Sequence, residues 1–242
     1  MRKLWLLPLS AALMVSTVLA QDNSACTLPG ERVVEDESND SGAQPGVGDQ
    51  AFLDLQTLHM AEPESMPGTL VFTFKVRGLS QLPPGVRWAV LFATPTPPAN
   101  GGEGWFVMMT TLDDGPNPHF VYGTTGVQPP DAPTGVRLFS VLGNLSSGSG
   151  FNTDGTITLV LEKAVLGALP AGAFIENVFP IVRTLVTPNG NSFDQAPGTG
   201  FYEVIGDEAC GESKSGLLGA GALPLTLLLP FGLLALRRRR LS

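Results

Sequence analysis

The chain is poor in the residues that most catalytic sites need. Its 242 residues include only two histidines. Neither His59 nor His119 has a partner at metal-ligand spacing, and the His-Glu-x-x-His, Gly-x-Ser-x-Gly and phosphate-loop patterns do not occur. His119 is the better candidate for a base, because Asp113 and Asp114 are near it in the sequence, but its place after a Gly-Pro-Asn turn is typical of a strand start. The sequence favours a non-catalytic protein, although paired carboxylates would leave no motif.

Basic residues are scarce in the body of the chain. Six of the fourteen lie in the first three and the last six positions, so the rest of the chain has eight basic residues against twenty-two acidic ones. An acidic surface repels nucleic acid and anionic lipid headgroups, which excludes nucleic acid as a partner. The same charge suits a soluble surface protein or one that binds divalent cations.

Residues 1–20 have the pattern of a secretory signal peptide. Met1-Arg2-Lys3 precedes an apolar run from Leu4 to Leu19, and the small-x-small sequence Val18-Leu19-Ala20 precedes Gln21. This pattern predicts export, with cleavage after Ala20. Because Gln21, and not a cysteine, follows that site, lipoprotein processing is not expected.

The C-terminal segment has the composition of a membrane span. Residues 216–236 carry no charge, and at about 1.5 Å per residue a helix of this length spans about 30 Å, the thickness of the hydrocarbon core. Arginines after the span are retained in the cytoplasm, so everything before residue 216 is expected outside. The arginines of the cytoplasmic tail, residues 237–242, are Arg237, Arg238, Arg239 and Arg240.

Two interpretations of this segment remain. It is either a permanent anchor, for which Pro224 and Pro230 are unfavourable, or a processed sorting signal. Small residues such as Gly219 and Gly221, an apolar span and a final arginine cluster resemble the tripartite sorting tails of Gram-negative bacteria. The glycine-rich start is similar to tails cut by rhombosortase-type intramembrane proteases, although the strict Gly-Gly pair is missing. The resemblance implies a C-terminal processing protease as a partner.

The chain contains two cysteines, and they bracket its whole body. Cys26 follows the predicted signal peptide and Cys210 precedes the predicted membrane span, in a compartment that oxidises thiols. We predict an intramolecular Cys26–Cys210 disulfide. Two free thiols or an intermolecular bridge are the alternatives.

The body of the chain has the two-residue period of β-strands, with no amphipathic helical period over ten residues. The clearest alternation is Leu70-Val71-Phe72-Thr73-Phe74-Lys75-Val76. Other expected strands start near Phe52 and Arg87 or cover 105–112, 119–122, 136–142, 156–163, 173–185 and 201–205. Short strands between Gly- and Pro-rich turns predict an all-β fold, a single β-sandwich of jelly-roll or immunoglobulin-like type, over residues 51–208. An acidic arm, 21–50, would precede it, and a linker, 209–215, would follow.

The body also resembles a known kind of domain. Cys26-Thr27-Leu28-Pro29-Gly30, the 70–76 strand and Asp154-Gly155-Thr156-Ile157 are similar to a secreted domain of bacterial surface proteins. That domain is also found appended to extracellular proteases. The resemblance covers about Cys26 to Cys210 and implies a sandwich, a disulfide and an accessory role beside a hydrolase.

Two sets of residues are candidates for ligand binding. Carboxylates separated by turn residues supply the oxygen atoms that calcium prefers, and they are the only cofactor site expected, with solvated acidic residues as the alternative. These are Asp36, Asp40, Asp49 and Asp54. Trp105 and Tyr122 would stack on a sugar if exposed, whereas their place in alternating strands favours the core.

Three functions of different classes follow. We favour an exported, non-catalytic sandwich at the cell surface or envelope that binds a glycan or a protein or has a structural role. The alternatives are an accessory partner of a secreted hydrolase, and a small hydrolase with paired carboxylates.

Overall fold

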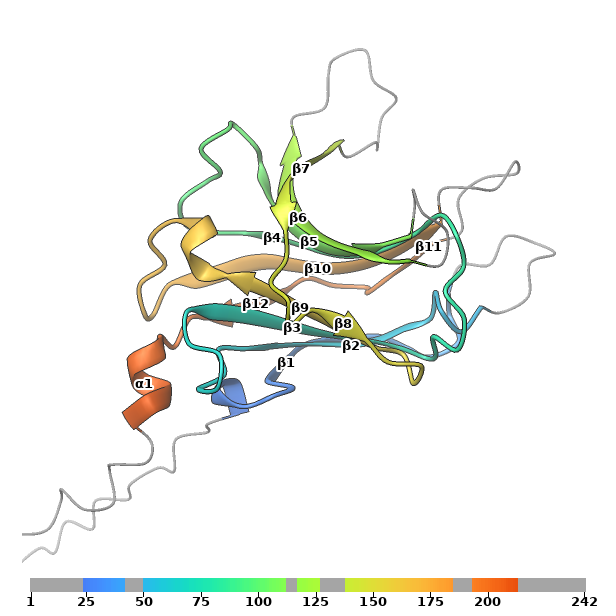
Figure 1. Ribbon diagram of the computed structural model, residues 1–242, viewed down its shortest axis with the longest axis horizontal. Helices are drawn as coiled ribbons and strands as arrows, with labels where there is room; N and C mark the ends of the chain where they lie inside the picture. The colour runs from blue at the N-terminus through green and yellow to red at the C-terminus, as the bar shows by residue number, and fades with distance from the viewer. Residues whose placement is uncertain (1–23, 42–49, 112–116, 127–137, 185–192, 213–242) are drawn as a thin grey trace, which may run out of the picture.

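Two β-sheets packed face to face make up the molecule (Figure 1). The computed structural model describes residues 24–41, 50–111, 117–126, 138–184 and 193–212. Helical structure in these residues is confined to the short segments η1 (Ser24–Cys26), η2 (Lys163–Leu166) and α1 (Asp207–Glu212). The predicted β-sandwich is confirmed.

The first sheet has five strands in the order β1-β2-β3-β9-β8, and every neighbouring pair is antiparallel. The strands are β1 (Glu31–Glu35), β2 (Leu55–Ala61), β3 (Thr69–Val76), β9 (Thr156–Glu162) and β8 (Gly150–Phe151). Strand β1 is therefore one edge of this sheet.

The second sheet has the order β11-β10-β4-β5-β6-β7, and β12 also pairs with β10. The strands are β11 (Phe193–Gln195), β10 (Phe174–Thr184), β4 (Val86–Ala93), β5 (Gly104–Thr110), β6 (His119–Gly126), β7 (Leu138–Asn144) and β12 (Gly200–Glu203). Strand β11 is an edge of this sheet, as β1 is of the first.

The main core lies between the sheets. The predicted inward residues of β3, Leu70, Phe72, Phe74 and Val76, are fully buried. Phe72 meets Phe92 of the other sheet with ring centroids 5.3 Å apart. Each such side chain contributes about 1.5–3 kcal/mol by leaving water. The strand alternation in the sequence therefore specifies which sheet faces meet.

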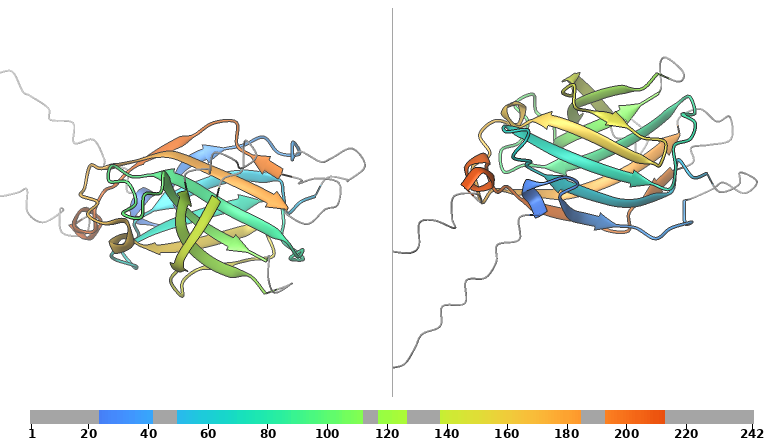
Figure 2. Two further views of the ribbon diagram at one scale, coloured as in Figure 1. Left: turned by 90° about the horizontal axis from the view of Figure 1, so that it is seen from above. Right: turned by 60° about the horizontal axis from the view of Figure 1, so that its bottom comes forward.

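A second apolar cluster lies on the outer face of the second sheet. It contains Ala89, Leu91, Phe106, Met108 and Val121, all buried. Phe139 of β7 packs edge-on against Phe106 with centroids 4.9 Å apart, so β7 curls over this face (Figures 1 and 2). A β-carbon on Gly123 would lie 2.0 Å from the carbonyl oxygen of Ser140, so the close approach of β6 and β7 requires glycine there.

The sandwich extends beyond its predicted boundaries on both sides. Strand β1 lies within the range expected to be an acidic arm. It belongs to the sandwich because Val34 is buried in the core, while Arg32 and Glu35 form an ion pair on the solvent side at 3.0 Å. Helix α1 likewise crosses the expected start of the linker at residue 209. The acidic residues around the two valines of β1 conceal the strand pattern, so the sequence did not predict this strand.

The predicted Cys26–Cys210 disulfide is present and joins η1 to α1, with the Cα atoms 5.3 Å apart. The first and last described residues therefore lie at one end of the sandwich, as the turned views show (Figure 2). The turns that precede β2 and follow β1 are at the opposite end, because these strands are antiparallel and Glu35 pairs with Thr57.

Candidate metal centre

The turn after β1 is built around a buried aspartate. Asp54 is fully buried, and both of its carboxylate oxygens accept a hydrogen bond from the backbone N–H of Asn39 at 3.0 Å. Arg77 donates to the Asn39 side chain at 2.7 Å and lies 3.3 Å from Asp54. Asn39 has a positive φ of 69°, a conformation that asparagine tolerates. Asp54 thus determines the path of residues 36–40.

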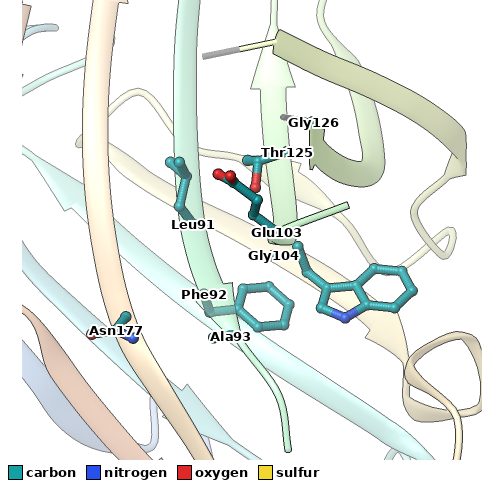
Figure 3. A pocket seen from close by; sticks show the side chains of 9 residues that line it. Leu91, Phe92, Ala93, Glu103, Gly104, Thr125, Gly126 and Asn177 are labelled. Atoms are coloured by element: carbon teal, nitrogen blue, oxygen red, sulfur yellow. The ribbon is translucent and has the colours of Figure 1, made fainter. Parts of the chain in front are cut away.

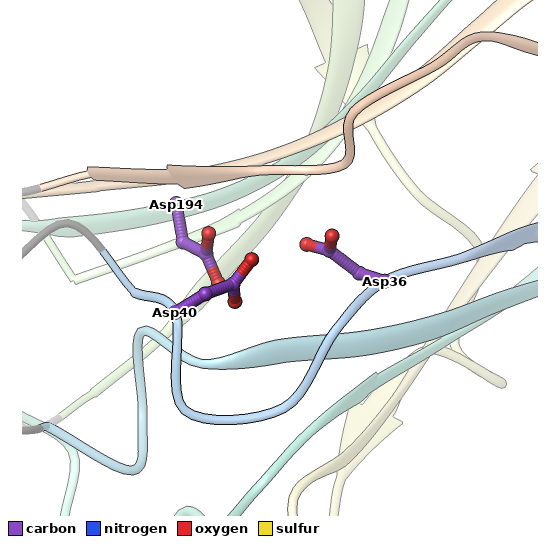
Figure 4. Close-up of side chains that lie close together, drawn as sticks. All are labelled: Asp36, Asp40 and Asp194. Atoms are coloured by element: carbon purple, nitrogen blue, oxygen red, sulfur yellow. The ribbon is translucent and has the colours of Figure 1, made fainter.

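That path brings together three carboxylates from distant parts of the chain. Asp36 and Asp40 flank the turn, and Asp194 projects toward them from β11 (Figure 4). One oxygen from each side chain lies within 4.8 Å of the other two. Asp194 is itself held in place, since it accepts from the N–H of Leu55 at 2.7 Å and of Gln195 at 2.9 Å. The cluster links an edge strand of one sheet to an edge strand of the other.

The surroundings of this cluster disfavour the ionised form of its carboxyl groups. Burial, followed by the negative charges of Asp194, Asp40 and Asp54, raises the pKa of Asp36 to about 6. Burial also raises the pKa of Asp194, against the two backbone hydrogen bonds that it accepts. Oδ1 of Asp36 accepts from the N–H of Glu37 at 3.1 Å, but its buried Oδ2 has no hydrogen-bond partner in the part of the chain that the structure describes. A hard cation or a shared proton would relieve this repulsion.

Another buried carboxylate lies at the disulfide end. Glu62 accepts from Tyr202 Oη at 3.2 Å, from the N–H groups of Ile205 and Gly206 at 2.7 and 3.1 Å, and from Lys163 Nζ at 2.7 Å. Lys163 also pairs with Asp207 at 2.6 Å. Burial opposes the charge on Lys163, yet hydrogen bonds to Asp207 and Glu62 raise its pKa. Glu62 has every acceptor position used, so its role is structural.

The four predicted calcium ligands have different fates. Asp36 and Asp40 lie in the cluster, Asp49 lies outside the described residues, and Asp54 uses its oxygens on Asn39 and Arg77. Asp194, which the sequence analysis did not select, replaces Asp54 as the third carboxylate. No spacing in the sequence links residues this far apart, and only the packing of the two sheets brings them together.

The predicted sugar-stacking residues do not form an exposed platform. Trp105 is 6% exposed and donates to Thr94 Oγ1 at 3.1 Å, while half-buried Tyr122 packs against the core. Trp105 contributes to the wall of a hollow of about 260 Å³ in which Glu103 lies beside Thr125 (Figure 3). Because stacking on a sugar needs an exposed ring face, the structure favours the core alternative for both residues.

An exposed aromatic pair occurs elsewhere. Phe174 of β10 is 43% exposed and Phe201 of β12 is 70% exposed, with ring centroids 6.3 Å apart. Phe201 borders a hollow of about 420 Å³ with Glu31 and Glu203 on its walls. No sequence signal distinguishes this pair, since Phe174 and Phe201 alternate like core residues, and only the pairing of β10 with β12 shows that both point outward.

Close carboxylates also bear on the hydrolase alternative. Asp36 and Asp194 are 9% and 4% exposed, and Asp40 is the exposed member of the cluster. His59 points Nδ1 at the carbonyl oxygen of Gly30 at 3.2 Å, and His119 is the first residue of β6, as its preceding turn predicted.

The predicted signal peptide and membrane span lie outside the described residues. This includes Gly219, Gly221 and the four terminal arginines. Within the part of the chain that the structure describes, no helix has the length and apolar character to cross a bilayer. Comparison with known protein families, curated proteins and solved structures gave no match.

Proposed function

We propose that this chain is an exported, non-catalytic β-sandwich protein, held at the cell envelope by its C-terminal segment and displaying a binding or structural domain. The disulfide carries the proposal. A bridge between Cys26 and Cys210 closes nearly the whole described domain, and such bridges persist where thiols are oxidised. The signal-peptide pattern of residues 1–20 and the uncharged span 216–236 are consistent with this location.

The position of the two chain ends supports display. Because η1 and α1 are joined by the disulfide, a tether that follows residue 212 attaches to that end of the sandwich. The turns around Asp36, Asp40 and Asp194 would then point away from the membrane. The jelly-roll or immunoglobulin-like type of the sandwich, and cleavage of the tail by an intramembrane protease, remain predictions of the same proposal.

A binding role is supported by the exposed ring faces of Phe174 and Phe201. Exposed aromatic rings beside carboxylates are suited to stacking on a sugar ring and hydrogen bonding its hydroxyls. On a glycan array we expect the protein to bind, and Phe201→Ala to reduce that binding by about tenfold, roughly 1.4 kcal/mol. Equal binding by Phe201→Ala would exclude this surface as the glycan site.

Mass spectrometry of the mature protein tests the location. We expect an N-terminus at Gln21 and a linked Cys26–Cys210 peptide pair. In a separate assay, protease added outside intact cells should digest the protein. A tail that ends before the arginines would show processing, and an intact tail in the membrane fraction would show a permanent anchor. Recovery of the uncut chain from the cytosol with reduced thiols would refute the proposal.

A further inference from the structure

The turn at the end of β1 contains a buried carboxylate oxygen for which the described residues supply no donor. Asp36 is only 9% exposed, and its Oδ2 has no hydrogen-bond partner among the described residues. Figure 4 shows its carboxylate directed toward Asp40 and Asp194. Buried carboxylates are normally paired with cations, hydrogen-bonded or coordinated to metals, so this oxygen requires a ligand.

From this oxygen and its neighbours, we propose that Asp36, Asp40 and Asp194 bind one calcium ion, which links the edge strands of the two sheets. The proposal goes beyond the envelope location and does not depend on it. Asp36 and Asp40 belong to the turn after β1, while Asp194 belongs to β11. An ion between them would link the two sheets at the end of the sandwich opposite the disulfide.

The geometry agrees with calcium coordination. Calcium takes six to eight oxygens at about 2.3–2.6 Å, so oxygens on opposite sides of the ion are at most about 4.6–5.2 Å apart. One oxygen of each of the three aspartates lies within 4.8 Å of the others. Three carboxylates offer up to six oxygens, with water completing the shell. Asp40 is exposed, which gives the ion a route from solvent.

The charges around the site agree as well. The nearby charges that act on Asp36 are those of Asp194, Asp40 and Asp54, all negative. Backbone N–H groups hold Asp36 and Asp194 in position, through Glu37 at 3.1 Å and Leu55 at 2.7 Å. These hydrogen bonds leave a second lone pair on each oxygen for a cation. Two of the three ligands, Asp36 and Asp194, are therefore positioned before the ion arrives.

Calorimetric titration of calcium into the full-length protein, extracted in detergent with its disulfide intact and stripped with chelator, tests the site. We expect one saturable site with a Kd of about 1 mM or tighter, the range of extracellular calcium modules. Asp36→Asn and Asp194→Asn should each weaken binding by about tenfold or more. Glu37→Gln removes the same charge from an exposed neighbour and should leave the Kd unchanged.

If the heat of binding is too small to measure, thermal unfolding provides a second test of the site. Calcium should raise the Tm of the wild type and of Glu37→Gln, but not that of Asp36→Asn. Asp36→Asn should still fold, because the amide oxygen can accept from the Glu37 N–H. Calcium at 10 mM that changes neither heat nor Tm would overturn the proposal in favour of a shared proton. Equal losses in Asp36→Asn and Glu37→Gln, or a response to magnesium as strong as to calcium, would also overturn it.

Discussion

Strand β2 has a buried carboxylate region at each of its ends, and the two are compensated in opposite ways. Glu62, directly after β2, accepts from a lysine, a tyrosine and two backbone N–H groups. At the other end, past Asp54, the buried Asp36 faces Asp40 and Asp194, and one of its oxygens has no donor within the described ranges. Seven residues of strand, about 23 Å, separate the two regions.

The comparison separates a structural carboxylate from one available to a ligand. Glu62 is surrounded by donors from η2, β12 and the segment before α1, so its charge stabilises the end that holds the first and last described residues. The aspartate cluster has backbone N–H groups that orient it but is surrounded by like charges. Burial alone therefore does not mark a carboxylate as a candidate ligand, whereas burial without compensation does.

Removal of Glu62 should have the largest effect. Glu62→Ala leaves Lys163 Nζ and Tyr202 Oη without their shared acceptor, so we expect the free energy of unfolding to fall by about 3–5 kcal/mol. Urea denaturation measures this loss. Glu208→Gln, an exposed position on α1, is the matched control and should change stability by less than about 0.5 kcal/mol. Equal losses of unfolding free energy in both variants would show that the donors around Glu62 do not make it a structural carboxylate.

Loss of the disulfide should have the next largest effect. Cys26→Ser with Cys210→Ser should lower the free energy of unfolding by about 2–4 kcal/mol, because the unfolded chain gains freedom over a loop of 184 residues. Wild-type protein reduced with dithiothreitol should match the double variant. Amide hydrogen exchange should rise most near Glu62 and Cys26. A uniform rise that includes Leu55, near the aspartate cluster, would show that the two ends are not independent.

Neutralising Asp36 should stabilise the calcium-free protein. Its pKa is raised to about 6 from 3.8, so the native state holds the proton more tightly than the unfolded state. Stability from this group is present below about pH 4 and is lost as the pH rises through about 6. In chelator at pH 7.5, Asp36→Asn should therefore gain about 1–2 kcal/mol in free energy of unfolding. Thermal denaturation from pH 4 to 7 should show a smaller decline in the variant than in wild type, because the pKa of Asp194 is also raised.

The smallest effect is expected at Asp207. Partial burial acts against its charge, but hydrogen bonds from Lys163 and the Gly68 N–H lower its pKa below 3.8. The contribution of Asp207 to the free energy of unfolding is therefore present above about pH 4 and is lost as the pH falls below that value. This pH dependence is opposite to that of Asp36. Because the side chain is 43% exposed, Asp207→Asn should cost less than about 1 kcal/mol at pH 7. Acid denaturation of this variant should begin from a lower starting stability, with a shallower fall below pH 4 than in wild type.

The strands could be predicted where one face of a sheet is buried and the other is wet. Strand β3 has its predicted inward residues in the core, with Thr73 and Lys75 half-buried on the other face. Strand β5 is buried on both faces, because β7 covers the outer one, and its sequence shows no alternation that would reveal this. Strand β1 was not predicted, because the acidic residues that flank it conceal its pattern. Sequence periodicity reports burial, so it fails where a distant strand changes which face is buried.

The candidate metal centre could be predicted only in part. Asp36 and Asp40 were selected as carboxylates separated by turn residues, and the structure places both in the cluster. Asp54 was selected for the same reason and instead organises the turn through Asn39. Asp194 had no local signal, since its place beside Asp36 depends on the pairing of β11 with β10. Local spacing can suggest ligands within a turn but not the one from the opposite sheet.

The sequence by itself determined that this protein folds into short strands with alternating faces and that two cysteines bracket them. Both properties depend on local chemistry, namely the two-residue period of a strand and the small number of thiols. Only the tertiary structure decided which carboxylates are neutralised and which face one another. That outcome depends on the distances between residues far apart in the chain, and the packing of the two sheets sets those distances.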